Sequence, residues 1–182
     1  IGIRGSYGNG FNNSFEDKHL LLIGGGVGMA PINAIASDLI KKGNKVDVVG
    51  AAITKDELLY VDALEKLGAT VYPCTDDGSL GFKGFATDCT ANLLEDSTYD
   101  YAFVCGPEIM MKGIFDILED ASIPAQYSLE RYMKCALGVC GQCCVDDEGW
   151  RICVEGPVFE NDKINQISEF GKYRRDASGV KY

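Results

Sequence analysis

Four cysteines toward the C-terminal end of the sequence have a spacing that restricts what their segment can form. They are Cys135, Cys140, Cys143 and Cys153, in the pattern C-x4-C-x2-C-x9-C. The first part of this pattern is the plant-type spacing for the thiolate ligands of a [2Fe–2S] cluster. The small residues Ala136, Gly138 and Gly141 let the backbone curl close to the inorganic sulfides and offer them N–H donors. We therefore predict that the four cysteines hold a [2Fe–2S] cluster and that the protein has a redox function.

Other uses of grouped cysteines match the spacing less well. A zinc site built from four cysteines has two C-x2-C halves about 15–20 residues apart, and this sequence has one such half. A disulfide framework is typical of short secreted chains. A zinc-stabilised binding module without redox chemistry is therefore kept as the alternative from another class. Using Cys144 in place of Cys143 would lengthen the second gap to three residues, so we interpret Cys144 as a spare thiol.

The composition disfavours several kinds of partner and site. Among 182 residues, 17 are basic and 27 acidic, and the net charge of −10 disfavours a nucleic-acid partner. No apolar run approaches the ~20 residues that cross a bilayer, so no membrane is expected. The single histidine, His19, argues against imidazole-based zinc sites and catalytic triads. Residues 162–182 are locally basic and are expected to form a solvated tail; a docking segment is the alternative.

Strand-like apolar runs alternate with helical patterns along most of the chain. The predicted strands cover residues 19–23, 45–50, 69–73 and 101–105, with a further edge strand at 126–128. The predicted helices cover residues 31–42, 55–67, 85–94 and 108–118. Thr54 is expected to cap the second helix, and Gly68 to end it. This alternation predicts an α/β fold with a doubly wound parallel sheet, followed by the cysteine segment as a separate small lobe.

A glycine-rich turn joins the first predicted strand to the first predicted helix. It covers residues 24–31 and reads GGGVGMAP. Glycines permit a tight turn and a close backbone approach, and the N-terminus of the following helix favours negative charge. The pattern is G-x-G-x-x-P, not the G-x-G-x-x-G of a Rossmann dinucleotide site. We predict that Gly25, Gly26, Val27 and Gly28 cradle a pyrophosphate; a turn that serves packing alone is the alternative.

Two further segments end at the same predicted edge of the sheet, where open α/β sheets bind their ligands. Cys105 and Gly106 follow the fourth predicted strand, and we predict that they flank a nicotinamide. The alternative for Cys105 is an ordinary buried thiol. Thr75 and the Asp-Asp-Gly turn after it follow the third strand and are predicted to contact the nucleotide. Together with Cys74 and Cys89, Cys105 lacks metal-binding spacing, which indicates reduced thiols in a cytoplasmic protein.

Six stretches of the sequence resemble ferredoxin-reductase-type nucleotide domains that carry a C-terminal [2Fe–2S] lobe. Within that group they most resemble the electron-transfer subunits of dihydroorotate dehydrogenase. The stretches are residues 4–11, 24–31, 75–81, 105–108, 128–135 and 153–159. The resemblance covers nearly the whole chain. The cysteine segment, with its Gly-Pro-Val-Phe ending, is the most specific part of it.

The resemblance implies an oxidoreductase component with three cofactors: a [2Fe–2S] cluster, FAD and NAD. Electrons from dihydroorotate would pass through a catalytic dihydroorotate dehydrogenase flavoprotein subunit, the cluster and FAD to NAD⁺, in pyrimidine biosynthesis. The two subunits would form a hetero-oligomer. Because the hydride and one-electron steps belong to the cofactors, no catalytic acid or base is expected from this chain. The nearest rival is a diaphorase or electron-transfer subunit of a cytosolic hydrogenase or of an anaerobic sulfite reductase.

The resemblance also implies a division of the chain. Residues 1–14 would be the remnant of the end of an FAD-binding barrel that is otherwise missing. Residues 15–125 would form the NAD-binding domain, and residues 126–182 the cluster lobe and tail.

Two expectations concern specificity and partner contact. Ala52 stands where related reductases often carry an arginine for a 2′-phosphate, so NAD is favoured over NADP, although Lys55 can partly compensate. The segment 128–134, with Arg131 and Lys134, is expected to face the partner because the cluster must approach the partner's flavin.

Overall fold

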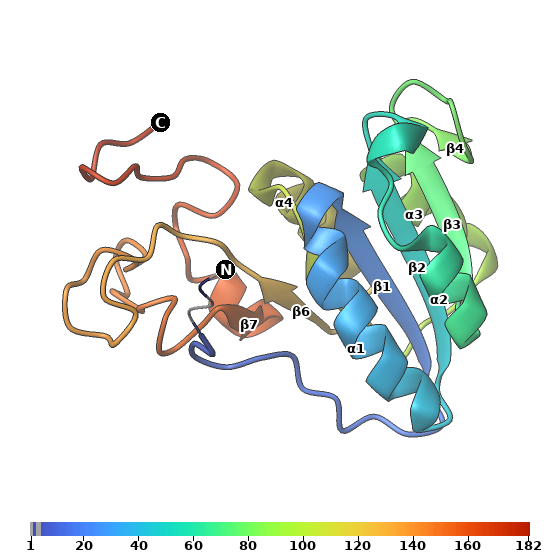
Figure 1. Cartoon of the computed structure of the whole chain (residues 1–182), viewed down its shortest axis with the longest axis horizontal. Helices are drawn as coiled ribbons and strands as arrows, with labels where there is room; N and C mark the ends of the chain where they lie inside the picture. Colours follow the sequence, from blue (N-terminus) through green and yellow to red (C-terminus); the bar gives the residue numbers. More distant parts are fainter. Residues whose placement is uncertain (1, 3–4) are drawn as a thin grey trace.

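A mostly parallel sheet organises the chain. The computed structural model describes residue 2 and residues 5–182; residues 1, 3 and 4, part of the predicted barrel remnant, lie outside it. Within the described residues, seven strands form one sheet in the order β4-β3-β2-β1-β5-β6-β7 (Figure 1). The strands are β1 His19–Gly25, β2 Lys45–Ala52, β3 Thr70–Thr75, β4 Phe82–Lys83, β5 Tyr101–Cys105, β6 Ala125–Ser128 and β7 Val158–Glu160. All neighbours are parallel except β6 and β7. The predicted doubly wound α/β fold is confirmed.

Strand β1 lies at the centre of the sheet because it is apolar on both faces. Its residues 20–23 are completely buried. Leu20 and Leu22 belong to the core on one face of the sheet, and Leu21 and Ile23 belong to the core on the other. A strand covered on both faces is expected to be a continuous apolar run rather than an alternating one.

Two helices cover each face of the sheet. α1 (Met29–Lys41) and α2 (Val61–Leu67) lie on one face, and α3 (Ala86–Asp96) and α4 (Glu108–Asp120) lie on the other (Figure 1). α1 buries Ile32, Ile35, Ala36 and Leu39, a single face at helical spacing, as predicted. The four-residue helix α5 (Asn161–Ile164) follows β7.

The helix predicted at residues 55–67 is wrong in its first half. The structure has a 3₁₀ turn at Lys55–Glu57, and the α-helix begins only at Val61. Tyr60 adopts a left-handed conformation with φ of 63°, which an α-helix cannot contain. Thr54 makes no side-chain capping bond to the described backbone. The N–H of Lys55 donates instead to Ser79 Oγ at 2.8 Å. Gly68 ends the helix as predicted.

Strand β6 was expected at residues 126–128 on the edge of the sheet, and the edge position is wrong. β7 pairs with it in antiparallel orientation and matches Tyr127 to Phe159. Phe159 is buried and belongs to the same core as Tyr127. The sheet therefore continues past the predicted boundary at residue 125, and that division of the chain stays a prediction.

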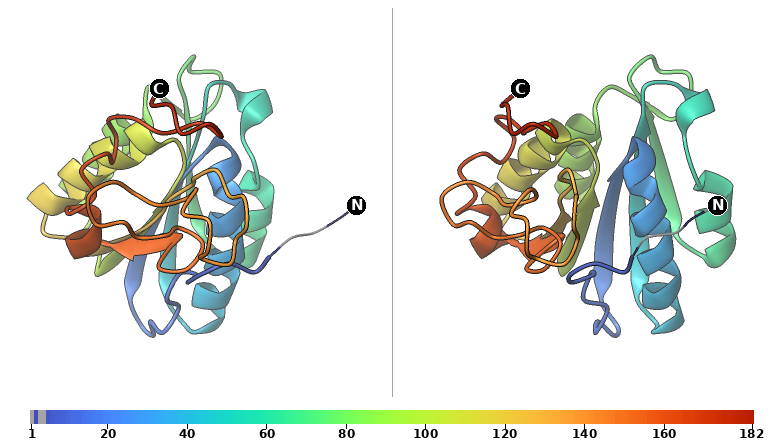
Figure 2. Two further views of the ribbon diagram at one scale, coloured as in Figure 1. Left: turned by 90° about the vertical axis from the view of Figure 1, so that its left-hand side faces the viewer. Right: turned by 60° about the vertical axis from the view of Figure 1, so that its left-hand side comes forward.

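The cysteine lobe packs against the sheet with both of its ends. Figure 2 shows its loops, in orange, beside the β6–β7 end of the sheet. Ile152, Ile164 and Phe170 join the core on the α3–α4 face. On the other side the N-terminal segment contacts the lobe, because Asn9 N donates to the carbonyl of Gly156 at 2.6 Å.

The tail is docked on the protein, which contradicts the solvated tail expected for residues 162–182. Residues 174–182 form a small hairpin, closed by backbone bonds of 3.0 and 2.9 Å between its ends. Asp146 of the lobe accepts a hydrogen bond from Arg175 Nη2 at 2.8 Å and pairs with Lys181 at 3.4 Å. The basic residues of the tail are therefore used in part to neutralise an acidic residue of the lobe. Within the described residues, no helix combines the length and the apolar character that crossing a bilayer requires.

We expect Phe159→Ala to destabilise the protein by about 3–5 kcal/mol, because the ring is buried where β7 closes the sheet and stacks on Trp150. Urea unfolding followed by circular dichroism measures this loss. Leu137→Ala is the control: this side chain is 79% exposed, and its truncation should change the unfolding free energy by no more than about 0.5 kcal/mol. Equal effects of the two substitutions would contradict the assignment of β7 to the core.

Candidate functional site

The order in which the chain adds strands to the sheet reverses between β1 and β5. The chain proceeds from β1 outward through β2, β3 and β4, and then returns to place β5 on the other side of β1. The loops that leave β1 and β5 therefore run to opposite faces from neighbouring strand ends. A crevice outside the carboxyl ends of the strands at such a point is the usual ligand site of an open α/β sheet.

The glycine turn and the end of β5 meet at this point. A Cβ on Gly28 would lie 2.4 Å from the carbonyl oxygen of Cys105, and a Cβ on Gly106 would lie 3.0 Å from the nitrogen of Gly25. Gly26 has a φ of 53°, the left-handed region that glycine adopts without strain. Only glycines permit this approach of two backbones. We call residues 25–28 and 105–106 the glycine shelf.

The two remaining residues of the glycine shelf differ in exposure. Val27 is 81% exposed at the tip of the turn. Cys105 is half-buried, pairs with Gly24 across β1 and β5, and lies opposite Ser128 of β6. Burial raises the pKa of its thiol, so the thiol stays protonated near neutral pH. The structure brings the predicted pyrophosphate and nicotinamide residues together, and their roles toward a nucleotide stay predictions.

Thr75 lies apart from the glycine shelf, at the carboxyl end of β3. It is completely buried, and its hydroxyl donates to the carbonyl of Leu80 at 2.8 Å and accepts from the N–H of the same residue at 3.1 Å. The side chain therefore closes the turn of residues 75–80 rather than facing a crevice. Its predicted contact with a nucleotide has no support from this geometry and stays a prediction.

The turn that Thr75 closes lies against the end of β2. The N–H of Asp76 donates to the carbonyl of Ala52, and the N–H of Asp77 donates to that of Ile53, both at 3.2 Å. Asp76 and Asp77 are exposed, so two carboxylates stand where β2 itself supplies none. Asp77 Oδ1 accepts from the N–H of Ser79 at 2.9 Å, and the bonds from Ser79 lower the pKa of Asp77.

The four cysteines of the motif lie in one loop. Cys143 and Cys153 are buried, Cys135 is half-buried and Cys140 is exposed. Within the described part of the chain, no three His, Cys, Asp or Glu side chains are gathered in a way that could hold a metal ion. Cys144, the next residue after Cys143, is half-buried. The ligand assignment and the spare role of Cys144 stay predictions.

The backbone of this loop supplies donors to sulfur. The N–H groups of Leu137 and Cys140 each donate to Cys135 Sγ at 3.4 Å. These bonds, that from Leu137 first, lower the pKa of Cys135 to about 6 and favour the thiolate, which is the form that binds metal. Gly138 and Gly141 have φ of 75° and 70°, which keeps the backbone tightly curled. Four thiols with amide donors directed at sulfur fit a [2Fe–2S] cluster in donor type and in charge.

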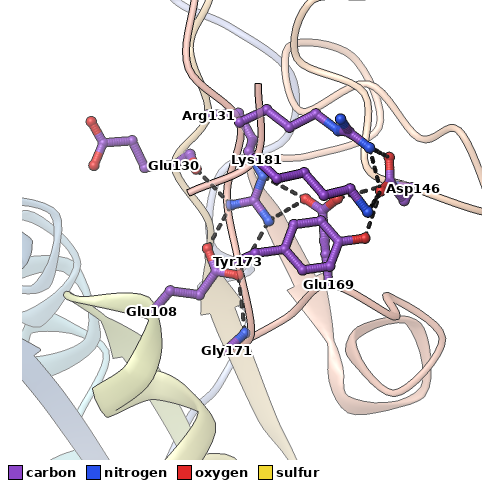
Figure 3. A network of polar contacts seen from close by, with 9 residues as sticks. Glu108, Glu130, Arg131, Asp146, Glu169, Gly171, Tyr173 and Lys181 are labelled. Atoms are coloured by element: carbon purple, nitrogen blue, oxygen red, sulfur yellow. Dashed lines mark hydrogen bonds and ion pairs between the residues drawn. The ribbon is translucent and has the colours of Figure 1, made fainter. Parts of the chain in front are cut away.

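A buried ion network connects this loop to the rest of the protein (Figure 3). Arg131 is 8% exposed and lies between Glu108 (6%) and Glu169 (1%). Its Nη1 donates to Glu108 Oε2 at 2.5 Å, and its Nη2 donates to Glu169 Oε1 at 2.6 Å. No local pattern predicts this network, because the partners are 23 and 38 residues from Arg131.

This network corrects one expectation. Arg131 does not face a partner, because its guanidinium is buried and used within the chain. A buried cation requires carboxylate partners, and α4 and the tail segment supply them to the guanidinium. Lys134 is exposed, and its predicted place at a partner interface stays a prediction.

We expect Gly28→Ala to destabilise the protein by about 1–3 kcal/mol, because the added methyl group would overlap the carbonyl of Cys105 and push the two loops of the glycine shelf apart. Thermal unfolding measures the loss. The matched control is Gly10→Ala, since a Cβ at Gly10 has no described atom within 4 Å. A Gly28→Ala variant as stable as the control would show that the loops are not in contact.

Comparison with family models and with known proteins agrees with this geometry. Residues 22–116 match the oxidoreductase NAD-binding domain, and residues 130–165 match the iron–sulfur cluster binding domain of dihydroorotate dehydrogenase B. Among solved structures, the chain is similar to a chain of an NADH-dependent reduced ferredoxin–NADP oxidoreductase. The TM-score is 0.79 at 32% identity, over 94% of this chain and 63% of the other.

Curated relatives extend along nearly the whole chain. The probable dihydroorotate dehydrogenase B (NAD(+)) electron transfer subunit of Methanothermobacter thermautotrophicus is 53% identical over 98% of this chain and 66% of its own length. The protein of the same name from Methanocaldococcus jannaschii is 50% identical over 100% of this chain and 69% of its own length. The chain thus spans about two thirds of the length of these relatives. It belongs to the family of dihydroorotate dehydrogenase B electron transfer subunits.

Proposed function

We propose that this protein carries electrons between NAD and a dihydroorotate-oxidising flavoprotein subunit, through FAD and a [2Fe–2S] cluster held by Cys135, Cys140, Cys143 and Cys153. The observation that carries the proposal is the 50–53% identity with electron transfer subunits over nearly the whole chain, which includes both the glycine shelf and the cysteine loop. A C-terminal hydrogenase domain of Pyrococcus furiosus is 21% identical, and that likeness concerns the fold alone. It gives the rival hydrogenase function no support.

The residues of the chain would divide the work by position. When bound, the cluster and FAD supply the one-electron and hydride chemistry. The glycine shelf would hold the pyrophosphate of NAD with its backbone N–H groups, with the N-terminus of α1 behind it. Cys105 would lie beside the nicotinamide as an apolar, protonated neighbour. The cysteine loop would hold the iron.

No proton-transferring side chain is needed in this scheme, and the position of the single histidine agrees. His19 is the first residue of β1, at the end of the strand opposite the glycine shelf. Its Nε2 lies 2.9 Å from Asp47 Oδ2, which also accepts a hydrogen bond from Tyr99 at 3.0 Å. Its ring packs against Tyr99 with the centroids 4.4 Å apart. The imidazole is thus part of a structural network rather than of the site.

The exposed carboxylates beside β2 support NAD rather than NADP. A 2′-phosphate bound at the end of β2 would lie near Asp76 and Asp77, and like charges repel. Lys55 also lies at this point, because its N–H donates to Ser79 in the same turn. It is one cation beside two carboxylates, so it does not reverse the sign of the local charge. The cytoplasmic location is likewise proposed, from eight cysteines that form no disulfide in the described chain.

We expect Asp76→Asn to reduce the preference for NADH over NADPH by about 1 kcal/mol, or roughly fivefold, because one repelling charge is removed. Fluorescence titration with each nucleotide measures both dissociation constants. Asp120→Asn, which removes an equal charge from the far end of α4, is the control and should leave the ratio unchanged. An unchanged ratio in Asp76→Asn would contradict the proposed place of the ribose.

The cluster is tested by two neighbouring cysteines. After anaerobic purification, the wild type is expected to contain iron and to absorb visible light. Cys140→Ser should lose both, because it removes a ligand, whereas Cys144→Ser should keep both. Equal loss in the two variants would refute the ligand assignment. A folded but colourless and iron-free wild type would refute the proposed function itself and favour the zinc alternative.

A further inference from the structure

Arg131 uses every nitrogen of its guanidinium. Besides the two short bonds to Glu108 and Glu169, its Nε donates to Glu169 Oε1 at 2.8 Å and its Nη2 to Glu108 Oε1 at 3.2 Å. Its Nη1 also donates to the carbonyl of Glu130 at 2.8 Å. Five donors in a planar fork match two carboxylates and one carbonyl, and a lysine ammonium cannot reproduce that geometry.

The two carboxylates extend the network in different directions. Glu108 begins α4, two residues after Gly106 of the glycine shelf, and its Oε1 accepts the N–H of Gly171 at 3.2 Å. Glu169 Oε2 accepts the N–H of Asp146 at 3.1 Å, three residues after Cys143. Arg131 itself precedes Cys135 by four residues. One guanidinium therefore joins the start of α4, the tail, and both sides of the cysteine loop; Figure 3 shows its contacts with Glu108 and Glu169.

A network of this kind is an expensive way to gain stability. Two buried carboxylates and one cation must all leave water, and apolar side chains of similar volume often stabilise a fold as well or better. Its distinctive property is that it permits one arrangement of the joined segments. The loop it fixes has little regular structure of its own: between β6 and β7 the described backbone contains only turns, bends and residues of two isolated bridges.

We propose that Arg131 is a positioning residue that sets the place of the cysteine loop relative to the glycine shelf. The inference rests on the proposed function, because position matters only if electrons pass between a nucleotide at the shelf and a cluster in the loop. Electron transfer slows as the two centres move apart, so a displaced loop lowers its rate. Loss of the guanidinium should therefore slow cluster reduction without weakening nucleotide binding, since the shelf keeps its own backbone contacts.

The test separates position from stability. Arg131→Met leaves two buried carboxylates unpaired and should lower the urea midpoint. The triple variant Arg131→Met, Glu108→Gln, Glu169→Gln leaves no buried charge in the network and should recover most of that midpoint. Arg131→Lys keeps the charge without the fork. Arg175→Met, which breaks the pair with Asp146 nearby, is the matched control outside the network.

Each variant is prepared together with the FAD-binding barrel that the resemblance implies, is loaded with flavin and cluster, and is studied with three measurements. These are the dissociation constant of NADH, the rate at which NADH reduces the cluster, and amide hydrogen exchange in residues 129–143. In the triple variant we expect the first within about twofold of wild type, the second lower by about tenfold or more, and the third faster. Arg131→Lys should fall between the triple variant and wild type. Arg175→Met should match wild type in all three.

Two results would overturn the inference, and they are distinguishable. A triple variant with the midpoint, cluster reduction and exchange of wild type would show that the network does not position the loop, while the proposed function stands. A wild-type chain that binds neither iron nor NADH would end the proposed function and this inference with it. Iron content and the EPR spectrum of each variant confirm that a slower rate does not come from a lost cluster.

Discussion

Backbone meets backbone where the loops after β1 and β5 touch, and no side chain fits between them. Gly28 and the carbonyl of Cys105 are close enough that a single methyl group would separate them. This contact fixes the start of α1 against the start of α4. Because Glu108 begins α4, the same contact determines where the carboxylate that receives Arg131 is held, and through it where the cysteine loop lies. The glycine contact thus positions Glu108, and the buried ion pair between Glu108 and Arg131 in turn positions the cysteine loop.

The cysteine lobe depends on the sheet for most of its order. Its own regular structure is limited to the three residues of β7 and the four of α5. Apolar side chains such as Ile152 and Phe170 place it on the α3–α4 face, which is where its stability comes from. In our proposal, the ion network sets the position of the loop rather than adding to its stability. A loop that would wrap four thiols around the proposed cluster needs freedom in its backbone, and the proposed network holds it in position through contacts with the rest of the chain.

Much of the fold could be read from local patterns, and the failures share a physical cause. Continuous apolar runs predicted β1 and β5 because parallel strands are buried on both faces. The glycine turn was predicted because its conformation depends on consecutive residues of the chain. The helix predicted at residues 55–67 failed because a left-handed Tyr60 and a bond from Lys55 to Ser79 override its apolar spacing. Short β7 and the buried state of Arg131 depend on partners far along the chain, which no local pattern contains.

The antiparallel closure of the sheet has a consequence during synthesis. β6 leaves the ribosome about thirty residues before β7, the strand that covers it. During that interval the nascent domain presents an unpaired row of backbone groups, a template for association with other chains. The carbonyl of Gly156 that receives Asn9 is also made long after Asn9, so Asn9 cannot form this bond until most of the cysteine loop has been synthesised. Synthesis of the cysteine loop and β7 is therefore also the step that covers the exposed strand β6 of the nascent domain.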